Sequence, residues 1–124
     1  MITGIGIDMI EPERVAEKIG KESGFRELVF SKKEIEYCEA KANKFEHYAA
    51  RFAAKEAFFK ALGTGWANGT AFNEIEIIHD ETGRPLLQLI GTTAETLTQL
   101  KNAKIFVSLS HLKASASALV IIEQ

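Results

Sequence analysis

The stretch RFAAKEAFFKALGTG, residues 51–65, decides the fold because it predicts a long helix that ends in a glycine-rich turn. Alanine favours helix, and a glycine just after the last helical residue is a common stop. Extended outward, the helix is predicted to begin near Asn43 or Lys44 and to run to Leu62, with Gly63 as its stop. We expect the other elements to pack around this helix.

Glu56 and Lys60 place two charges on an apolar face of the helix. Because residues four apart are neighbours on a helix, these side chains share a face with Phe52 and Phe59. One interpretation is a helix salt bridge, which contributes about 0.3–0.5 kcal/mol at a surface. The other is a functional pair, and a second acidic position far away in the sequence favours it.

That second acid is Asp8, in the apolar run ITGIGIDMI of residues 2–10, which predicts a strand. Aspartate is disfavoured in strands, so Asp8 needs a partner, either a turn amide, a buried base or a metal. The alternative is that Asp8 caps the next helix. Gly4 and Gly6 weaken a strand unless another backbone or a ligand comes close to it.

Capping signals predict two further helices before the long one. Pro12 stands at an early helical position with acids around it, and Ser31 with Glu34 matches the capping box of a helix that runs to about residue 40. Between them lies a short apolar segment that is expected to enter the core. Its side chains are Phe25, Leu28, Val29 and Phe30.

The second half of the chain predicts two β-hairpins with a helix between them. The hairpins are residues 71–79 with 84–90 and residues 104–109 with 117–122, and Thr92 or Thr93 caps a helix to about Leu100. This order predicts an α+β fold in which an antiparallel sheet packs against the long helix. A chain of 124 residues is expected to form a single domain, residues 1–124.

Composition excludes several classes of protein. The 15 basic and 17 acidic residues nearly balance, which argues against a nucleic-acid partner. No stretch approaches the 18 or more apolar residues of a membrane span, and the N-terminus lacks a signal-peptide pattern. The single cysteine, Cys38, is expected to pack in the interior and fits a reducing compartment. We therefore expect a soluble, cytoplasmic protein with no membrane partner.

Several polar side chains are candidates for binding. Arg14, Lys18 and Lys21 lie along one edge of the first helix, which either receives an acidic protein helix or is simply solvated. The loop GTGWANG, residues 63–69, can approach a phosphate, although a helix stop explains it equally well.

The three histidines differ in their setting. His47 and His79 are interpreted as surface or satisfied core residues. His111, at the end of the apolar strand that contains SLSH, is better placed for a site, with a structural role equally open.

If the first strand packs beside the long helix, Asp8 and Glu56 converge with Lys60 close by. Two hard carboxylates suit Mg²⁺, which fills its remaining positions with water and substrate phosphate oxygens. Lys60 would contact the same phosphates as a point charge. The chemistry that this set implies is transfer of a phosphoryl group.

Three motifs together resemble holo-[acyl-carrier-protein] synthases, the short bacterial type of 4′-phosphopantetheinyl transferase. They are GIGIDMIE at residues 4–11, RFAAKEAFFKALGTG at residues 51–65 and SLSH at residues 108–111. The resemblance spans essentially the whole chain, and the middle motif is its specific part. It implies the 4′-phosphopantetheinyl transferase fold and a homotrimer with active sites between protomers.

The activity that the resemblance implies is Mg²⁺-dependent transfer of 4′-phosphopantetheine from coenzyme A to a serine of apo acyl carrier protein, in fatty acid biosynthesis. Adenosine 3′,5′-bisphosphate is the other product. The group that accepts the serine proton stays open among a water, a metal-bound hydroxide and a carboxylate. A different Mg²⁺-dependent phosphotransferase and a non-catalytic module that binds coenzyme A or a carrier protein are the alternatives.

The resemblance also assigns roles to residues by motif position. Asp8 and Glu56 would bind the metal, and Lys60 would contact the pyrophosphate and is a candidate acid for the leaving phosphate. The coenzyme A site would be lined by His111, Gly63 and Gly65, with Arg84 and Pro85 near the adenine. The acyl carrier protein would meet Arg14, Lys18 and Lys21. Phe59 departs from the family, in which a smaller residue, often serine, is usual.

Overall fold

A computed structural model describes residues 1–21 and 24–124, in which the predicted elements follow one another with one addition, the short helix α2. The elements are β1 (Ile2–Ile10), α1 (Pro12–Lys21), α2 (Phe25–Val29), α3 (Lys32–Glu39), α4 (Lys44–Leu62), β2 (Ile75–His79), β3 (Pro85–Leu89), α5 (Gly91–Thr96), β4 (Lys104–His111) and β5 (Ala116–Glu123). The α+β class is confirmed.

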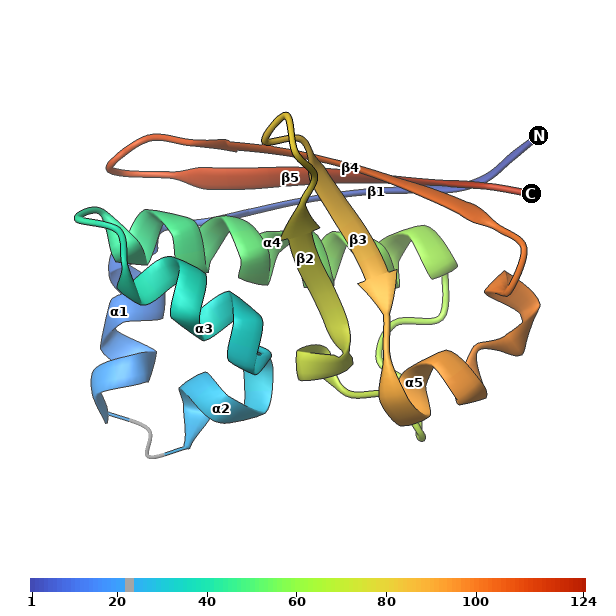
Figure 1. Ribbon diagram of the computed structural model, residues 1–124, viewed down its shortest axis with the longest axis horizontal. Coiled ribbons are helices and arrows are strands. Elements are labelled where there is room, and N and C mark those ends of the chain that lie inside the picture. The colour runs from blue at the N-terminus through green and yellow to red at the C-terminus, as the bar shows by residue number, and fades with distance from the viewer. Residues whose placement is uncertain (22–23) are drawn as a thin grey trace.

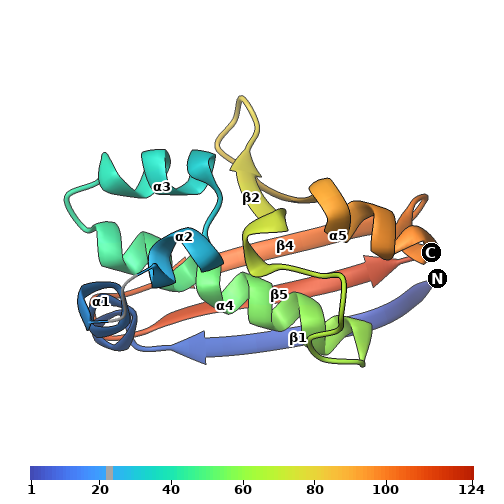
Figure 2. The ribbon, with the colours of Figure 1, turned by 90° about the horizontal axis from the view of Figure 1, so that it is seen from below.

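The long helix α4 lies along one face of a three-stranded antiparallel sheet whose strand order is β1-β5-β4 (Figure 1). The strands β2 and β3 pair in a separate antiparallel hairpin, and α1, α2 and α3 gather toward one end of α4 (Figure 2). Because α4 is enclosed between the sheet and these smaller elements, even two of its charged residues, Arg51 and Lys55, are buried.

Two glycines of β1 allow α4 to approach the sheet closely. A Cβ atom on Gly6 would overlap the carbonyl oxygen of Ala57, and one on Gly4 would overlap that of Ala61. Only a residue without a side chain fits at such a distance from a backbone. Of the two possibilities left open for these glycines, another backbone or a ligand, the structure shows the backbone of α4.

The opposite face of the sheet carries apolar side chains, and within residues 1–21 and 24–124 no helix covers it (Figure 1). Ile5, Ile7 and Met9 of β1 are 64%, 62% and 68% exposed. Since successive residues of a strand point to opposite faces, Asp8 then lies on the side of α4. The apolar run of β1 is therefore largely exposed in this chain, while its small and polar residues face inward.

The region before β2 differs from the prediction. The strand expected over residues 71–79 begins only at Ile75, because Phe72–Glu74 forms a 3₁₀ turn. The Glu74 carboxylate accepts hydrogen bonds from the N–H groups of Thr92 (3.2 Å) and Thr93 (3.0 Å), which ties this turn to the start of α5.

The helix α5 also differs from the prediction. It begins at Gly91, so the expectation that Thr92 or Thr93 caps it was wrong. The Thr93 hydroxyl is buried instead and donates a hydrogen bond of 2.8 Å to Glu74. The helix ends at Thr96, and a 3₁₀ turn occupies Thr98–Leu100, where the helix was expected to continue.

The predicted capping box is present at the start of α3. The Ser31 hydroxyl accepts a hydrogen bond from the Glu34 N–H (3.2 Å), and the Glu34 carboxylate accepts one from the Ser31 N–H (2.8 Å). Phe30, just before it, is buried as expected. Leu28 was wrongly placed in the core, because it lies on the outer side of the single turn α2 and is 71% exposed.

Candidate active site

Asp8 and Lys60 meet on the β1 side of α4. The Lys60 ammonium donates hydrogen bonds to Asp8 Oδ1 at 3.1 Å and to the carbonyl oxygen of Ile7 at 2.9 Å. The structure thus pairs Lys60 with β1 rather than with Glu56, its neighbour one turn earlier on the helix. Of the partners proposed for Asp8, a base is the one observed, although the Lys60 side chain is exposed and not buried.

Glu56 completes this group, which we call the β1-side cluster (Asp8, Glu56 and Lys60). Burial raises the pKa of the Glu56 carboxyl, and the nearby Asp8 carboxylate raises it further, while Lys60 acts in the opposite direction. Two carboxylates that disfavour each other's charge form a site that attracts a cation. The sequence prediction that Asp8, Glu56 and Lys60 converge agrees with this geometry.

The turn after α4 continues from this cluster. Gly63 has a φ of 81°, the left-handed conformation of a helix stop, and its N–H donates to the carbonyl oxygens of Phe59 (3.2 Å) and Lys60 (3.0 Å). The Gly63 amide therefore serves the end of the helix. Gly65 follows with a φ of 65° and leads to Trp66, which is 58% exposed.

A pocket of about 220 Å³ lies on the other side of α4, against β4. We call it the β4-side pocket. It contains His111 and Pro85, which the sequence assigned to one ligand, whereas Arg84 lies outside its lining, in the preceding turn. Its lining residues are Tyr37, His47, Ala50, Arg51, His79, Gly83, Pro85, Leu109 and His111.

Arg51 is the cation of the β4-side pocket. It is only 1% exposed, its guanidinium carbon lies 4.3 Å from the centre of the Tyr37 ring, and its Nη1 donates to the His47 carbonyl oxygen at 3.1 Å. Its Nε and Nη2 groups have no hydrogen-bond partner among the described residues. Buried guanidinium donors without a partner are rare, and their natural complement is an anion.

Histidines surround Arg51 in this pocket. The rings of His47 and His111 lie 4.8 Å apart, and His111 Nδ1 is 2.8 Å from Glu46 Oε1. The ring of His79 stacks on Tyr37 at 4.8 Å. His47 and His79 were interpreted as surface or core residues, but both line the pocket with His111. The one available signal was the spacing of His47 and Arg51, four residues apart on the same helix.

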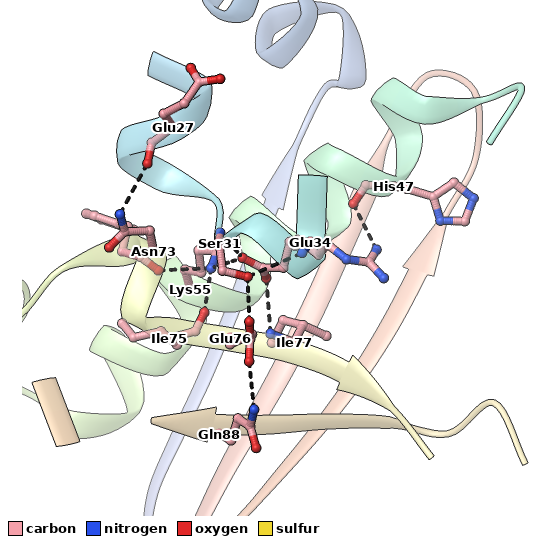
Figure 3. A network of polar contacts seen from close by, with 12 residues as sticks. Glu27, Ser31, Glu34, His47, Lys55, Asn73, Ile75, Glu76, Ile77 and Gln88 are labelled. Carbon is pink, nitrogen blue, oxygen red and sulfur yellow. Dashed lines mark hydrogen bonds and ion pairs between the residues drawn. The ribbon is translucent and has the colours of Figure 1, made fainter. Parts of the chain in front are cut away.

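A third polar group is the buried network around Lys55 (Figure 3). The fully buried Lys55 ammonium donates to Glu34 Oε1 at 2.8 Å and to the carbonyl oxygens of Phe72 (2.9 Å) and Ile75. Glu34 also accepts from the N–H of Ile77 at 3.0 Å. These contacts join α3, α4 and β2, and they satisfy each hydrogen of the ammonium group.

The β1-side cluster and the β4-side pocket are separated within one chain. Arg51 and Glu56 are five residues apart, which turns their side chains about 140° from each other around the helix axis. The strands β1 and β4 are opposite edges of the sheet, with β5 between them. One face of α4 packs on that sheet, and other parts of the helix pack on α3 and β2.

The predicted basic edge lies on α1. Arg14 lies 3.9 Å from Glu11 in an exposed ion pair, and the Lys18 ammonium lies 5.6 Å from the centre of the Phe25 ring. Lys21 is exposed at the last position of α1.

In the described part of the chain, no helix is both long and apolar enough to cross a membrane.

The chain is similar to known proteins along nearly its whole length. A model of the 4′-phosphopantetheinyl transferase superfamily matches residues 4–117. The holo-[acyl-carrier-protein] synthase of Cytophaga hutchinsonii is 46% identical over 125 residues, which cover 98% of this chain and 97% of that protein.

Solved structures of similar proteins share the fold. The crystal structure of holo-[acyl-carrier-protein] synthase (AcpS) from Neisseria meningitidis has a TM-score of 0.88 at 29% identity, with 100% of each chain covered. A holo-(acyl-carrier-protein) synthase from Bacillus anthracis in complex with CoA (3′,5′-ADP) has a TM-score of 0.82 at 34% identity, with 100% of this chain and 98% of that chain covered.

Proposed function

The chain belongs to the 4′-phosphopantetheinyl transferase superfamily, and we propose that it acts as a holo-[acyl-carrier-protein] synthase. It transfers the 4′-phosphopantetheine group from coenzyme A to a serine of apo acyl carrier protein, in fatty acid biosynthesis, and releases adenosine 3′,5′-bisphosphate. The observation that carries this proposal is the β1-side cluster of two carboxylates and a lysine. Residues 1–124 act as one domain, in the cytoplasm.

The β1-side cluster fits a magnesium ion. In the described part of the chain, no group of three or more histidine, cysteine or acidic side chains could hold a metal. Magnesium commonly takes only one or two protein carboxylates, and Asp8 with the pKa-raised Glu56 supplies such a pair. When bound, Mg²⁺ would neutralise charge on the pyrophosphate of coenzyme A.

The reaction is a displacement at the β-phosphorus of coenzyme A. The carrier serine oxygen forms a bond to this phosphorus and loses its proton to a base, for which a water and a carboxylate are candidates. The bond to the bridging oxygen breaks, and its electron pair leaves with adenosine 3′,5′-bisphosphate. Lys60 has a half-exposed side chain, and among the described residues its ammonium bonds to Asp8 and the Ile7 carbonyl, so it can turn to the pyrophosphate. There its positive charge stabilises the leaving phosphate.

The β4-side pocket would hold the nucleotide end of coenzyme A. The resemblance placed Pro85 near the adenine and His111 in the coenzyme A site, and Arg51 adds two buried nitrogen groups that lack a partner among the described residues. A guanidinium of this kind binds a phosphate through two parallel hydrogen bonds. The pantetheine end, with its reacting phosphate, would lie at the β1-side cluster.

Within one chain the two groups lie toward opposite edges of the sheet, β1 and β4. We infer that each active site combines the β1-side cluster of one protomer with the β4-side pocket of its neighbour. The exposed face of the sheet supports the association of copies, since Ile5, Ile7 and Met9 are more than half exposed. A homotrimer is the assembly that we propose, with three equivalent sites.

The basic edge of α1 would receive the acyl carrier protein. Arg14, Lys18 and Lys21 lie on the helix that directly follows β1, so a carrier bound there would be close to the end of β1 that carries Asp8. Exposed charges of this kind mainly set the rate and orientation of encounter, so we expect salt to slow the reaction.

The decisive experiment is mass spectrometry of apo acyl carrier protein after incubation with this protein, coenzyme A and Mg²⁺. We expect the carrier to gain the mass of one phosphopantetheine group, and a carrier whose acceptor serine is replaced by alanine is the control. Binding of coenzyme A without any mass gain would instead identify a binding module. Phosphoryl transfer from a nucleotide in place of coenzyme A would identify another phosphotransferase.

Mixing two inactive variants tests the shared site. Glu56→Gln disables the β1-side cluster and Arg51→Met disables the β4-side pocket. If the site lies between protomers, randomly mixed rings contain about one site in four with both halves intact, so about a quarter of the activity returns. No recovery in mixed oligomers of confirmed size would contradict the shared site. His111→Ala replaces Arg51→Met if the latter disturbs assembly.

A further inference from the structure

All three histidines of the chain line the β4-side pocket, although they are far apart in the sequence. His47 comes from α4, His79 from the end of β2 and His111 from the end of β4. Only His111 was assigned to a ligand from its motif. The role of the other two is therefore the question that the pocket raises.

The charged groups that face His47 and His79 are mostly basic. His47 is close to His111, Arg51, Lys41 and Glu46, and His79 is close to Arg51, Lys41 and Asp80. The Lys41 ammonium lies 4.7 Å from the centre of the Tyr37 ring, on which His79 stacks.

Both acids in this surrounding already have partners. Glu46 Oε1 lies 2.8 Å from His111 Nδ1. Asp80 Oδ1 accepts hydrogen bonds from the N–H groups of Thr82 (2.8 Å) and Arg84 (3.0 Å), in the turn after β2. Among the described residues, Arg51 therefore remains the buried cation of the pocket that has donor groups without a partner.

This surrounding favours the neutral form of His47 and His79. Burial lowers the pKa of His47 to about 4, with further lowering by His111 and Arg51, and burial with Arg51 lowers the pKa of His79. An anion placed among these groups would act in the opposite direction on both rings, because an opposite charge nearby favours the protonated imidazole.

We propose that His47 and His79 recognise the phosphate monoester of coenzyme A by taking up a proton from the solvent when this group binds beside Arg51. This inference rests on the proposed function. The 3′-phosphate is the one phosphate monoester of coenzyme A, and it is a dianion above its second pKa of about 6. A neutral imidazole offers one N–H donor, whereas an imidazolium offers two and a positive charge.

Proton uptake makes this recognition specific. Dephospho-coenzyme A lacks only the 3′-phosphate. Its binding should therefore not raise the pKa of the two histidines, and no proton uptake by them is expected. Each pKa unit by which the bound phosphate raises a histidine corresponds to about a tenfold gain in affinity at a pH below both values. The preference for coenzyme A over dephospho-coenzyme A should therefore increase as the pH falls from about 8 toward about 6.

Calorimetry tests this inference without reference to catalysis. Titration of the intact oligomer with coenzyme A at about pH 6.5, in buffers of different ionisation enthalpy, gives the number of protons taken up. The matched ligand is dephospho-coenzyme A, and the matched protein is the double variant His47→Gln, His79→Gln, which keeps polar side chains that do not titrate. We expect the wild type to take up about one proton more than the double variant.

The affinities give a second readout. The wild type should prefer coenzyme A over dephospho-coenzyme A about tenfold more strongly than the double variant does near pH 6, and this difference should shrink as the pH rises. Equal proton uptake by the two proteins, or by the two ligands, would overturn the inference. If the wild type binds neither ligand, the proposed function itself fails.

If the double variant does not assemble, each single variant is titrated instead. A single variant that keeps the whole pH-dependent preference removes that histidine from the proposal, and two such variants refute it.

Discussion

Two lysines of α4, Lys55 and Lys60, differ in how their charges are satisfied. Lys55 is fully buried, and its ammonium has three acceptors from Glu34 and from the chain around β2. Lys60, five residues further along α4, has a side chain that is 56% exposed and forms an ion pair with Asp8 of β1. The buried lysine is committed to structure, while the exposed lysine keeps the freedom to meet a ligand.

The same contrast separates Arg51 from Lys55, although both are buried. Lys55 belongs to a closed network, whereas two nitrogen groups of Arg51 lack a partner among the described residues. A buried donor without an acceptor is unfavourable, and a phosphate removes that penalty. The unsatisfied groups therefore distinguish Arg51 from Lys55, which burial and charge do not.

The largest expected effect comes from Lys55→Met. Removing one partner of a buried pair leaves Glu34 charged and buried, which lowers the free energy of unfolding by about 3–5 kcal/mol. The matched variant Lys60→Met removes an exposed ion pair and should change stability by less than about 1 kcal/mol. Urea denaturation compares the two, and equal losses would contradict the division between a structural and a functional lysine.

Glu56→Gln and Asp8→Asn test whether the β1-side cluster is needed for transfer. Each variant is expected to lower the transfer rate by about 10²-fold or more, because the proposed metal site loses a charged ligand. Thermal stability should be kept, since burial and Asp8 already disfavour the charged form of Glu56. The surface variant Glu95→Gln is the control, and near-normal transfer by Glu56→Gln would remove this residue from the site.

Gly6→Ala tests the close contact that places β1 beside Glu56. Its Cβ would overlap the Ala57 carbonyl oxygen, so strand or helix must shift, at a cost of about 1–3 kcal/mol in stability. Gly20→Ala in α1 meets no atom within 4 Å and should be neutral or stabilising by about 0.5–1 kcal/mol. Thermal melts of both variants decide whether local space, rather than glycine content, sets the effect.

His47 is expected to contribute a pH dependence to stability. Its pKa is about 4 in the folded protein, below the ordinary 6.5, so the unfolded chain binds the extra proton first as the pH falls. This part of the stability is present above pH 6.5 and is lost toward pH 4. Melting temperatures of the wild type and of His47→Gln across this range should converge as the pH decreases.

Local signals predicted most elements correctly. The capping box of Ser31 and Glu34, the stop at Gly63 and the apolar runs of β4 and β5 depend on residues close in sequence, so they can be recognised from the sequence. The errors occurred where a distant side chain intervened. Glu74 joins the 3₁₀ turn to α5 through hydrogen bonds from Thr92 and Thr93, and no sequence pattern around these threonines predicts that contact.

The sequence by itself determined the long helix, the α+β order of elements and the motif resemblance that brought Asp8, Glu56 and Lys60 into one hypothesis. Tertiary structure alone decided which charge meets which. It paired Lys60 with Asp8, buried Lys55 against Glu34, and gathered His47, His79 and His111 around Arg51. The physical reason is that spacing along one helix fixes direction, whereas partners and desolvation depend on the strands and helices that pack against each direction.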